Sequence, residues 1–401
     1  MEKPFISRVV INNYKSIAHC DVELGALQFL VGRNGAGKSN FLDALAFVRD
    51  VLEFNNLEKA VSDRVGGIFH SRKEEMNEKM KLIVMQLNLD MKIKFNLSNG
   101  ANGVFAFHIR KEESGHIVTE ESCRIEQKDG QIEEYKTQNG KLLNDDPQRF
   151  PPVASDRFYL QNMSAYNAFR PLYDALRTMR IYNFVPQHIV FPDRTSSNSL
   201  LMSDGNNVAQ VVSELTDGTK NRIQEYLQLV VPDIYDFCSR KGREGKYLEF
   251  QHKAGDFLHE SMSDGTLRAL CVLTALLHER KDGENNHPML IGIEEPETGL
   301  HASAAGVLLG AMMEAADMRQ VIIATHSAEM LDDKEIEIEQ ILPVEMRDGK
   351  TLIAPLENVT RDMLREHLTT VGELLRQDHL QPEAISQHDK NNKPPLSKSN
   401  K

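Results

Sequence analysis

The stretch Gly32-Arg33-Asn34-Gly35-Ala36-Gly37-Lys38-Ser39 has the form G-x-x-x-x-G-K-S of a phosphate-binding loop. It follows an apolar run, Leu27 to Val31, and precedes a helical pattern, Phe41 to Val51. In this strand–loop–helix setting the glycines let backbone N–H groups close around a polyphosphate, and the helix N-terminus adds partial positive charge. The pattern predicts nucleoside triphosphate binding, with Lys38 at the β- and γ-phosphates and Ser39 as a ligand of Mg²⁺.

Composition and charge limit the class of protein. The 401 residues include 47 basic and 59 acidic side chains, a net charge of −12, which argues against a surface coated for non-specific DNA binding but leaves room for a local basic groove. No apolar run approaches the roughly 20 residues that span a bilayer, and the N-terminus lacks a signal-peptide pattern. Four scattered cysteines are expected to be reduced thiols. We therefore expect a cytoplasmic protein.

The pattern of apolar runs predicts an α/β fold: a mixed parallel sheet core with an antiparallel β meander and a helical subdomain. Strands are expected at 5–11 and 18–24, and short alternating runs separated by turn signals indicate the meander between 81 and 127. Helical spacing begins near 165. The expected division is a discontinuous nucleotide-binding core at 1–85 and 250–345, an antiparallel β subdomain at 86–160, a helical subdomain at 161–249, a C-terminal extension at 346–386 and a disordered tail at 387–401.

Two further apolar strands end in residues that suit phosphate chemistry. The strand at 289–293 is followed by Glu294-Glu295-Pro296-Glu297, and the strand at 321–324 by Thr325-His326-Ser327. The helix expected at 303–316 makes this a β-α-β unit, which puts both strand ends on the sheet edge that carries the phosphate loop. Carboxylates there are placed to organise Mg²⁺ and to polarise water, and His326 to donate a hydrogen bond to the γ-phosphate or the attacking water. An acidic turn and a structural histidine are the alternatives.

A third segment, Ser261 to Arg268, opens an apolar helix from Ala269 to Leu277. Ser263 and Gly265 at a helix start would make a second anion-binding end. Simple capping by Ser263 or Asp264 is the alternative, and taken alone it is the better interpretation.

In this order the motifs resemble the ATP-binding-cassette (ABC) class of ATPases, in the branch shared with RecF, the SMC proteins and the overcoming-lysogenization-defect (OLD) family. Ser261–Arg268 stands where that class has its signature motif, Glu294–His301 is similar to the carboxylate and D-loop segment, and Asn12–Ser16 to an N-terminal N-F-K-S element. The chain looks like a stand-alone ATPase of the AAA_21 type, similar to the RloA and PARIS kind of defence ATPase, without the Toprim domain of OLD proteins. The resemblance implies a P-loop NTPase fold of ABC type.

The resemblance also implies a composite site. In this class ATP lies between two head-to-tail cassettes, so that Lys38 and Ser39 of one subunit would face Ser263 and Gly265 of the other. The expected partner is therefore a second copy of the chain. The nucleotide-binding residues so implied are Asn34, Gly35, Gly37, Lys38, Ser39, Asn40, Ser263, Gly265 and Lys15.

The same resemblance assigns catalytic roles for ATP hydrolysis with Mg²⁺. Glu295 would be the general base, His326 the switch histidine and Lys38 the phosphate-binding cation. Glu294, where many members of the class have Asp, would join Ser39 on the magnesium side. Gln86 is the candidate for the glutamine-bearing loop that normally completes such a site.

Several functions are compatible with these motifs. The first is the ATPase of a prokaryotic antiphage or abortive-infection system with a separately encoded effector or nuclease, because the about 75 residues after His326 show no Toprim-like acidic constellation. The second is a RecF-like DNA-repair or DNA-clamping ATPase, which a basic groove would favour. A transporter subunit ranks last, because nothing apolar spans a membrane. A non-hydrolysing switch is disfavoured by the presence of both Glu295 and His326.

Overall fold

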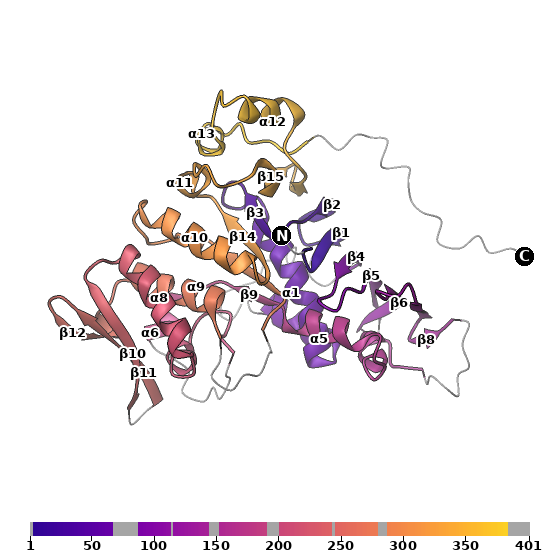
Figure 1. The fold of residues 1–401 in the computed structure, drawn as a ribbon. Helices are drawn as coiled ribbons and strands as arrows, with labels where there is room; N and C mark the ends of the chain where they lie inside the picture. The colour runs from indigo at the N-terminus through magenta and orange to yellow at the C-terminus, as the bar shows by residue number, and fades with distance from the viewer. Residues whose placement is uncertain are drawn as a thin grey trace, which may run out of the picture.

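One large sheet organises the molecule (Figure 1). The computed structural model describes residues 3–66, 87–113, 115–143, 152–190, 200–242, 245–279 and 287–383. Within them, thirteen strands join in the order β8-β7-β6-β5-β4-β1-β2-β16-β15-β3-β14-β13-β9. Their bounds are β1 Ile6–Tyr14, β2 Ile17–Glu23, β3 Leu27–Val31, β4 Leu89–Asn96, β5 Asn102–Glu112, β6 Gly115–Glu126, β7 Ile132–Gln138, β8 Lys141–Leu142, β9 Arg180–Tyr182, β13 Leu290–Glu294, β14 Gln320–Thr325, β15 Ile341–Arg347 and β16 Lys350–Ile353.

The parallel part of this sheet carries the sequence motifs at one edge. Strand β14 pairs in parallel with β3 on one side and with β13 on the other. Since parallel strands end at the same edge, the segments that follow β3, β13 and β14 are brought together there. The α/β fold class is confirmed, with the phosphate loop, the carboxylate turn and the histidine on the expected edge.

Helices cover both faces of the parallel strands, which explains why β3 and β14 are buried throughout. Leu30 and Ile322 belong to a core shared with α1, whereas Phe29 and Ile323 belong to a second core shared with α9 and α10. The helices are α1 Lys38–Phe54, α2 Leu57–Gly66, α4 Leu160–Met163, α5 Arg170–Thr178, α6 Pro186–Val190, α7 Val208–Val212, α8 Asp217–Val230, α9 Asp264–Leu277, α10 Ala304–Ala316, α11 Ala328–Leu331, α12 Asn358–Arg365 and α13 Val371–Arg376, with 3₁₀ turns η1 His259–Ser261 and η2 Ile338–Gln340.

An antiparallel wing, β4 to β8, continues the sheet from β1. Apolar side chains of β4 alternate with exposed lysines, as expected where one sheet face is packed and the other is solvated. The meander expected from the sequence is present and extends further than expected, because β7 adds a strand in spite of its charged residues. Gln86 and the tail at 387–401 lie outside the described residues.

The segment expected to be a helical subdomain, 161–249, also contains strands. Strand β9 pairs in parallel with β13 at the end of the main sheet. A second sheet, β10-β11-β12, is formed by Ile234–Gly242, Gly245–His252 and Gly255–Leu258, and lies on the opposite side of the molecule from the wing (Figure 1). Burial of Leu248 and Phe250 on alternate positions of β11 is the period-two pattern that favours a strand there.

The expected C-terminal extension, 346–386, does not lie apart from the core. Strand β15 pairs in parallel with β3, and β16 lies between β15 and β2. The chain thus returns to the sheet beside the phosphate loop before it forms α12 and α13 (Figure 1). In the described residues no helix combines the length and apolar character needed to cross a membrane.

Candidate active site

The glycines of the phosphate loop are required by crowding and by backbone conformation. Gly37 directly precedes α1 with a φ of +103°, and a Cβ on it would lie 1.9 Å from Thr351 Oγ1. A Cβ on Gly32 would lie 2.1 Å from the carbonyl oxygen of Val344. Gly35 has a φ of +82° and open space around its missing side chain. The C-terminal strands β15 and β16 therefore confine the loop on one side, while its other side is open.

The loop offers unused backbone donors. Within the described residues the N–H groups of Gly35, Gly37, Lys38 and Ser39 have no protein acceptor, whereas that of Ala36 donates to Arg33 O at 3.1 Å. They lie at the start of the 17-residue helix α1, where the helix dipole favours an anion. This arrangement fits a polyphosphate.

The side chain of Lys38 is folded back onto the loop. Its Nζ donates to the carbonyl oxygens of Gly32 at 2.7 Å and Arg33 at 3.0 Å. Burial lowers the pKa of Lys38, and three neighbouring carboxylates, Glu295 foremost, oppose that effect. The ammonium group is held by carbonyl acceptors that a bound phosphate would replace.

Ser39 and Glu294 meet across the sheet edge. The Ser39 hydroxyl donates to Glu294 Oε2 at 2.6 Å. Burial raises the pKa of Glu294; the Ser39 hydrogen bond lowers it, and the charges of Asp43 and Glu295 raise it. A hydroxyl and a carboxylate at this distance are the hard oxygen donors that Mg²⁺ prefers, and a bound cation would favour the ionised carboxylate.

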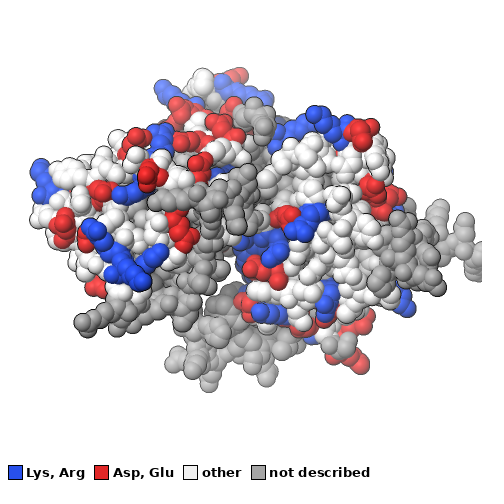
Figure 2. Space-filling model, turned by 60° about the horizontal axis from the view of Figure 1, so that its bottom comes forward, with Lys and Arg blue, Asp and Glu red and all other residues white. Residues whose placement is uncertain are grey.

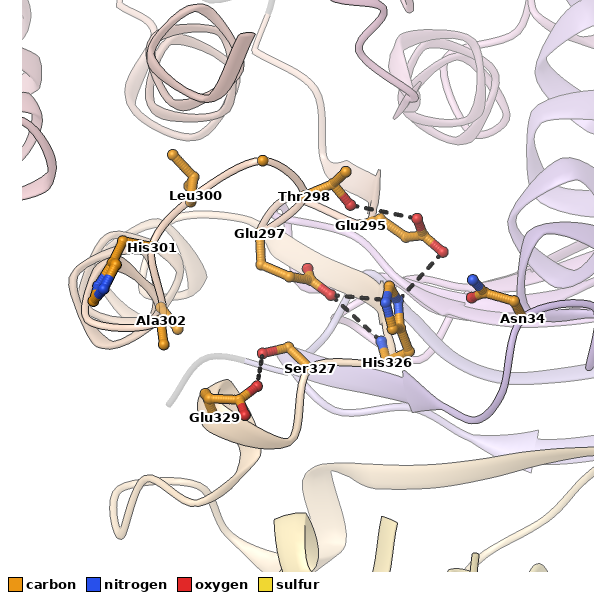
Figure 3. Close-up of a pocket in the computed structure, with 12 residues that line it drawn as sticks. Asn34, Glu295, Glu297, Thr298, Leu300, His301, Ala302, His326, Ser327 and Glu329 are labelled. Atoms are coloured by element: carbon orange, nitrogen blue, oxygen red, sulfur yellow. Dashed lines mark hydrogen bonds and ion pairs between the residues drawn. The ribbon is translucent and has the colours of Figure 1, made fainter. Parts of the chain in front are cut away.

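A cavity of about 490 Å³ lies beside the carboxylate turn (Figure 3). Its lining includes Asn34 from the phosphate loop, Glu295 and Glu297 from the carboxylate turn, and His326 from the end of β14. Glu295 has a φ of +45°, and its backbone N–H donates to Ala324 O at 2.8 Å. Its carboxylate Oε1 lies 3.5 Å from His326 Nδ1. One residue of the phosphate loop, two carboxylates and a histidine thus line one cavity, and Glu294 of the Ser39–Glu294 pair directly precedes Glu295 in the chain.

Residues 27–332 match the model of a P-loop family, AAA_21, described as "AAA domain, putative AbiEii toxin, Type IV TA system". The chain belongs to this AAA_21 family. It is a nucleotide-binding ATPase of that family.

This AAA_21 ATPase is 22% identical over 352 residues to a Helicobacter pylori protein named "ATP/GTP phosphatase", with 82% of this chain and 86% of that protein covered. Among solved structures it is similar to an SMC head domain from Thermotoga maritima, at 14% identity and a TM-score of 0.38, over 88% of this chain and 99% of that one. An SMC head domain with an extended coiled coil, bound to the C-terminal domain of ScpA derived from Pyrococcus furiosus, gives 12% identity and a TM-score of 0.47, over 91% and 99%.

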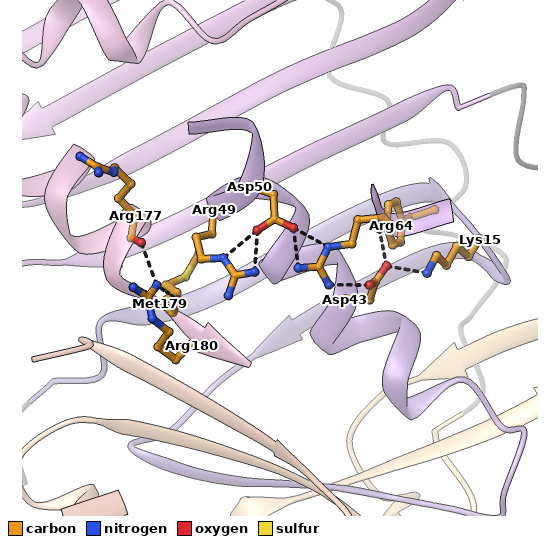
Figure 4. Close-up of polar contacts among 9 residues, drawn as sticks. Lys15, Asp43, Arg49, Asp50, Arg64, Arg177, Met179 and Arg180 are labelled. Carbon is orange, nitrogen blue, oxygen red and sulfur yellow. Dashed lines mark hydrogen bonds and ion pairs between the residues drawn. The ribbon is translucent and has the colours of Figure 1, made fainter. Parts of the chain in front are cut away.

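Lys15 of the AAA_21 ATPase is held by a carboxylate of α1. Its Nζ pairs with Asp43 Oδ2 at 2.6 Å, on the first turns of α1 (Figure 4). Tyr14 and Arg64 contact the same carboxylate. Burial raises the pKa of Asp43, but Lys15 and Arg64 outweigh burial and lower it. A well-satisfied carboxylate therefore holds Lys15 in this conformation.

Ser263 and Gly265 lie at the start of α9, and within the described residues no hydrogen bond joins Ser263 to the phosphate loop of the same chain. Ser263 caps α9: its hydroxyl accepts a hydrogen bond from the Thr266 N–H at 3.2 Å. Gly265 packs so closely on the D-loop segment that a Cβ would lie 2.2 Å from the carbonyl oxygen of Gly299. The capping interpretation describes the contacts of Ser263 within one chain.

Sequence reasoning missed a chain of polar contacts behind the loop. The Asn40 amide donates to Ser16 Oγ at 2.6 Å, Ser16 contacts Thr351 Oγ1 at 2.6 Å, and Thr351 donates to Ala36 O at 2.9 Å. Asn40, expected at the nucleotide, thus supports the loop from behind. No local signal marks Thr351, because it lies more than 300 residues from its partners.

Proposed function

We propose that the chain hydrolyses ATP in a site shared between two copies. The backbone donors of the phosphate loop and Lys38 would bind the β- and γ-phosphates, and Ser39 and Glu294 would hold Mg²⁺. Bound there, Mg²⁺ would neutralise charge on the phosphate oxygens. The 2.6 Å contact between Ser39 and Glu294 supports this assignment, because both oxygens are available at one point of the sheet edge.

Glu295 is proposed as the general base. Its carboxylate would accept a proton from water as the water oxygen bonds to the γ-phosphorus and the bond to the ADP oxygen breaks, giving ADP and phosphate. His326, 3.5 Å from Glu295, would donate a hydrogen bond to the γ-phosphate or the attacking water. The positive φ of Glu295 supports the role, since strained backbone is frequent at reacting groups.

The observation that carries the two-copy proposal is that the hydroxyl of the exposed Ser263 makes no hydrogen bond to the phosphate loop of its own chain within the described residues. One chain gathers Lys38, Ser39, Glu294, Glu295 and His326, whereas Ser263 is exposed at the start of α9 and its hydroxyl hydrogen-bonds, among the described residues, with Thr266 alone. The N-terminus of the 14-residue helix α9 would complete the site of the other copy in a head-to-tail dimer. A second copy would also exclude water from the open cavity.

Mixing two inactive variants tests this arrangement. Lys38→Ala removes the phosphate-binding cation and Ser263→Arg blocks the signature end, so a mixture contains heterodimers with one intact composite site. With equal amounts of the two variants half of the dimers are heterodimers with one intact site of two, so ATPase activity of the mixture should recover to about a quarter of the wild-type value, while each parent alone stays inactive. Folded parents that show no recovery on mixing would exclude the head-to-tail site. Glu295→Gln should in addition trap an ATP-bound dimer on gel filtration.

For the biological role, we propose the ATPase component of a prokaryotic antiphage or abortive-infection system that acts with a separately encoded effector. The family description, which refers to a toxin of a Type IV TA system, supports this role. Growth of phage-challenged cells with the wild-type chain or with Lys38→Ala tests it. Protection that is unchanged by Lys38→Ala would count against an ATP-driven defence function.

A RecF-like DNA-clamping ATPase is the second candidate, and one feature of the wing favours it. Four cations on the solvated face of the wing are exposed and make no ion pair within the described residues: Lys92, Lys94, Arg124 and Lys136. The exposed Glu134 lies opposite Arg124 on the neighbouring strand, and on the face seen in Figure 2 basic and acidic side chains are likewise intermixed. If this role is correct, the double variant K92E/K94E should weaken DNA binding and reduce its salt dependence by about two counter-ions.

A further inference from the structure

Glu297 is held between the carboxylate turn and the end of β14 (Figure 3). Its Oε1 accepts a hydrogen bond from the Thr325 hydroxyl at 2.5 Å and lies 3.4 Å from the backbone N of His326. The other oxygen, Oε2, is buried without a hydrogen-bond partner in the described residues. Only 11% of the Glu297 side chain is exposed. A carboxylate so enclosed and only partly satisfied costs stability, so a structural role alone does not account for it.

Two carboxylates face the same nitrogen of His326. Nδ1 lies 3.5 Å from Glu295 Oε1 and 3.8 Å from Glu297 Oε1, and both contacts are drawn in Figure 3. The two acceptors differ in freedom, because the Glu295 side chain is 36% exposed whereas Glu297 is anchored by Thr325. An acceptor at Nδ1 keeps the proton on that nitrogen and aims Nε2 away from it.

We propose that Glu297 is the positioning residue for His326, and that it frees Glu295 to take the proton from water. In the structure Glu295 Oε1 lies 3.5 Å from His326 Nδ1 and its Oε2 accepts from the Thr298 hydroxyl at 3.4 Å, so a turn of Glu295 toward water would lengthen its contact with the imidazole. When Glu295 turns toward water, the imidazole would close its 3.8 Å distance to the anchored Glu297 to hydrogen-bond length and so keep its orientation. This inference rests on the proposed roles of Glu295 and His326 in hydrolysis. It makes Glu297, the second glutamate of Glu295-Pro296-Glu297, part of the active site.

Substitutions at Glu297 separate positioning from proton transfer. Glu297→Gln keeps an oxygen that can accept from the Thr325 hydroxyl and, once the imidazole moves closer, from Nδ1–H, so kcat should stay within about threefold of wild type. Glu297→Ala removes the acceptor and should lower kcat about 10- to 100-fold with KM for ATP changed less than about threefold. If Glu297→Gln is instead as inactive as Glu295→Gln, Glu297 is a base and the positioning role is wrong.

A double-variant cycle tests whether Glu297 acts through His326. Glu297→Ala should lower kcat in the wild-type background but cause no further loss in His326→Ala, because the group it positions is then absent. Equal losses in both backgrounds overturn the inference alone. Full turnover of His326→Ala overturns the proposed role of His326 and the inference with it.

Two further variants keep the test decisive. Thr325→Val removes the hydroxyl that anchors Glu297 with little change in shape. It should lower kcat when His326 is present but not in His326→Ala. If Glu297→Ala does not fold, Thr325→Val takes its place in the double-variant cycle. Glu329→Gln is the matched control: it lines the same cavity, and its nearest hydrogen bond is with Ser327 Oγ at 3.3 Å. Its kcat should be that of wild type, and a loss equal to that of Glu297→Ala would show a non-specific effect of cavity charge and overturn the inference.

Discussion

Replacing Thr351 by Val tests whether the C-terminal strands support the phosphate loop. The Thr351 side chain is fully buried, and its hydroxyl donates to Ala36 O while it contacts Ser16 Oγ. Because the Thr351 proton is directed to Ala36, the Ser16 hydroxyl donates to Thr351, and the Asn40 amide donates to Ser16. Valine has nearly the same shape but removes the middle of this chain of hydrogen bonds.

The magnitude follows from the two bonds that are lost. At a net 0.5–1.5 kcal/mol for each hydrogen bond, Thr351→Val should lower the free energy of unfolding by about 1–3 kcal/mol. Ala36 lies inside the loop, so part of that loss should appear as weaker nucleotide binding. A loss of about 1 kcal/mol in binding corresponds to roughly a fivefold higher Kd for ATP.

Urea unfolding and ATP titration of the same samples measure both effects. Thr274→Val is the matched control, because Thr274 is equally buried and its hydroxyl bonds only to Leu270 O, within α9. The control should lose stability without a change in ATP affinity. If Thr351→Val loses no more stability than the control and binds ATP as wild type does, the loop does not depend on β16.

Three further predictions concern other parts of the molecule. Gly265→Ala should lower the free energy of unfolding by about 1–3 kcal/mol and reduce ATPase activity, because the new Cβ would meet the backbone of Gly299. Gly218→Ala is the control: its Cβ would come no closer than 3.9 Å to Thr216 Oγ1, so thermal unfolding should be unchanged. Burial raises the pKa of Glu121 to about 7, so the folded protein holds one more proton than the unfolded chain between about pH 4.5 and 7. The free energy of unfolding should therefore fall by about 3 kcal/mol as pH rises through that window. Urea unfolding at each pH should show a flatter pH dependence in Glu121→Gln, and an unchanged slope would contradict the assignment. Glu294→Gln should raise the Mg²⁺ concentration for half-maximal ATPase activity about tenfold, and an unchanged Mg²⁺ requirement would remove Glu294 from the metal side.

Local patterns predicted the edge of the sheet that carries the site. The strand before the phosphate loop and the β-α-β unit lie where the apolar runs indicated, because a fully buried parallel strand has few alternatives to a continuous apolar segment. The same reasoning explains why Glu294 meets Ser39, since both follow strands that end at one edge.

The contacts of Lys15 and the place of β16 in the sheet depend on residues far apart in the sequence, which local patterns do not reveal. Lys15 was expected at the nucleotide, and the sequence does not show that it also pairs with Asp43, which Tyr14 and Arg64 contact as well. Strand β16 is only four residues long and pairs with β2 at a single register position, Thr351 with Ile17, so no sequence window marks it as part of the core. Long-range pairing was therefore what the sequence alone did not give.

The insertion of β15 and β16 between β3 and β2 also sets an order of events during synthesis. The hydrogen bond between Ser16 and Thr351 joins residues 335 positions apart, and β3 has its two neighbours, β14 and β15, from the far end of the described chain. A ribosome that has made residues 1–300 has released the phosphate loop but none of the strands that flank it. Contacts of such long range form late and slowly. Nucleotide binding should therefore appear only after β15 and β16 have emerged, which couples the first motif of the chain to its last strands.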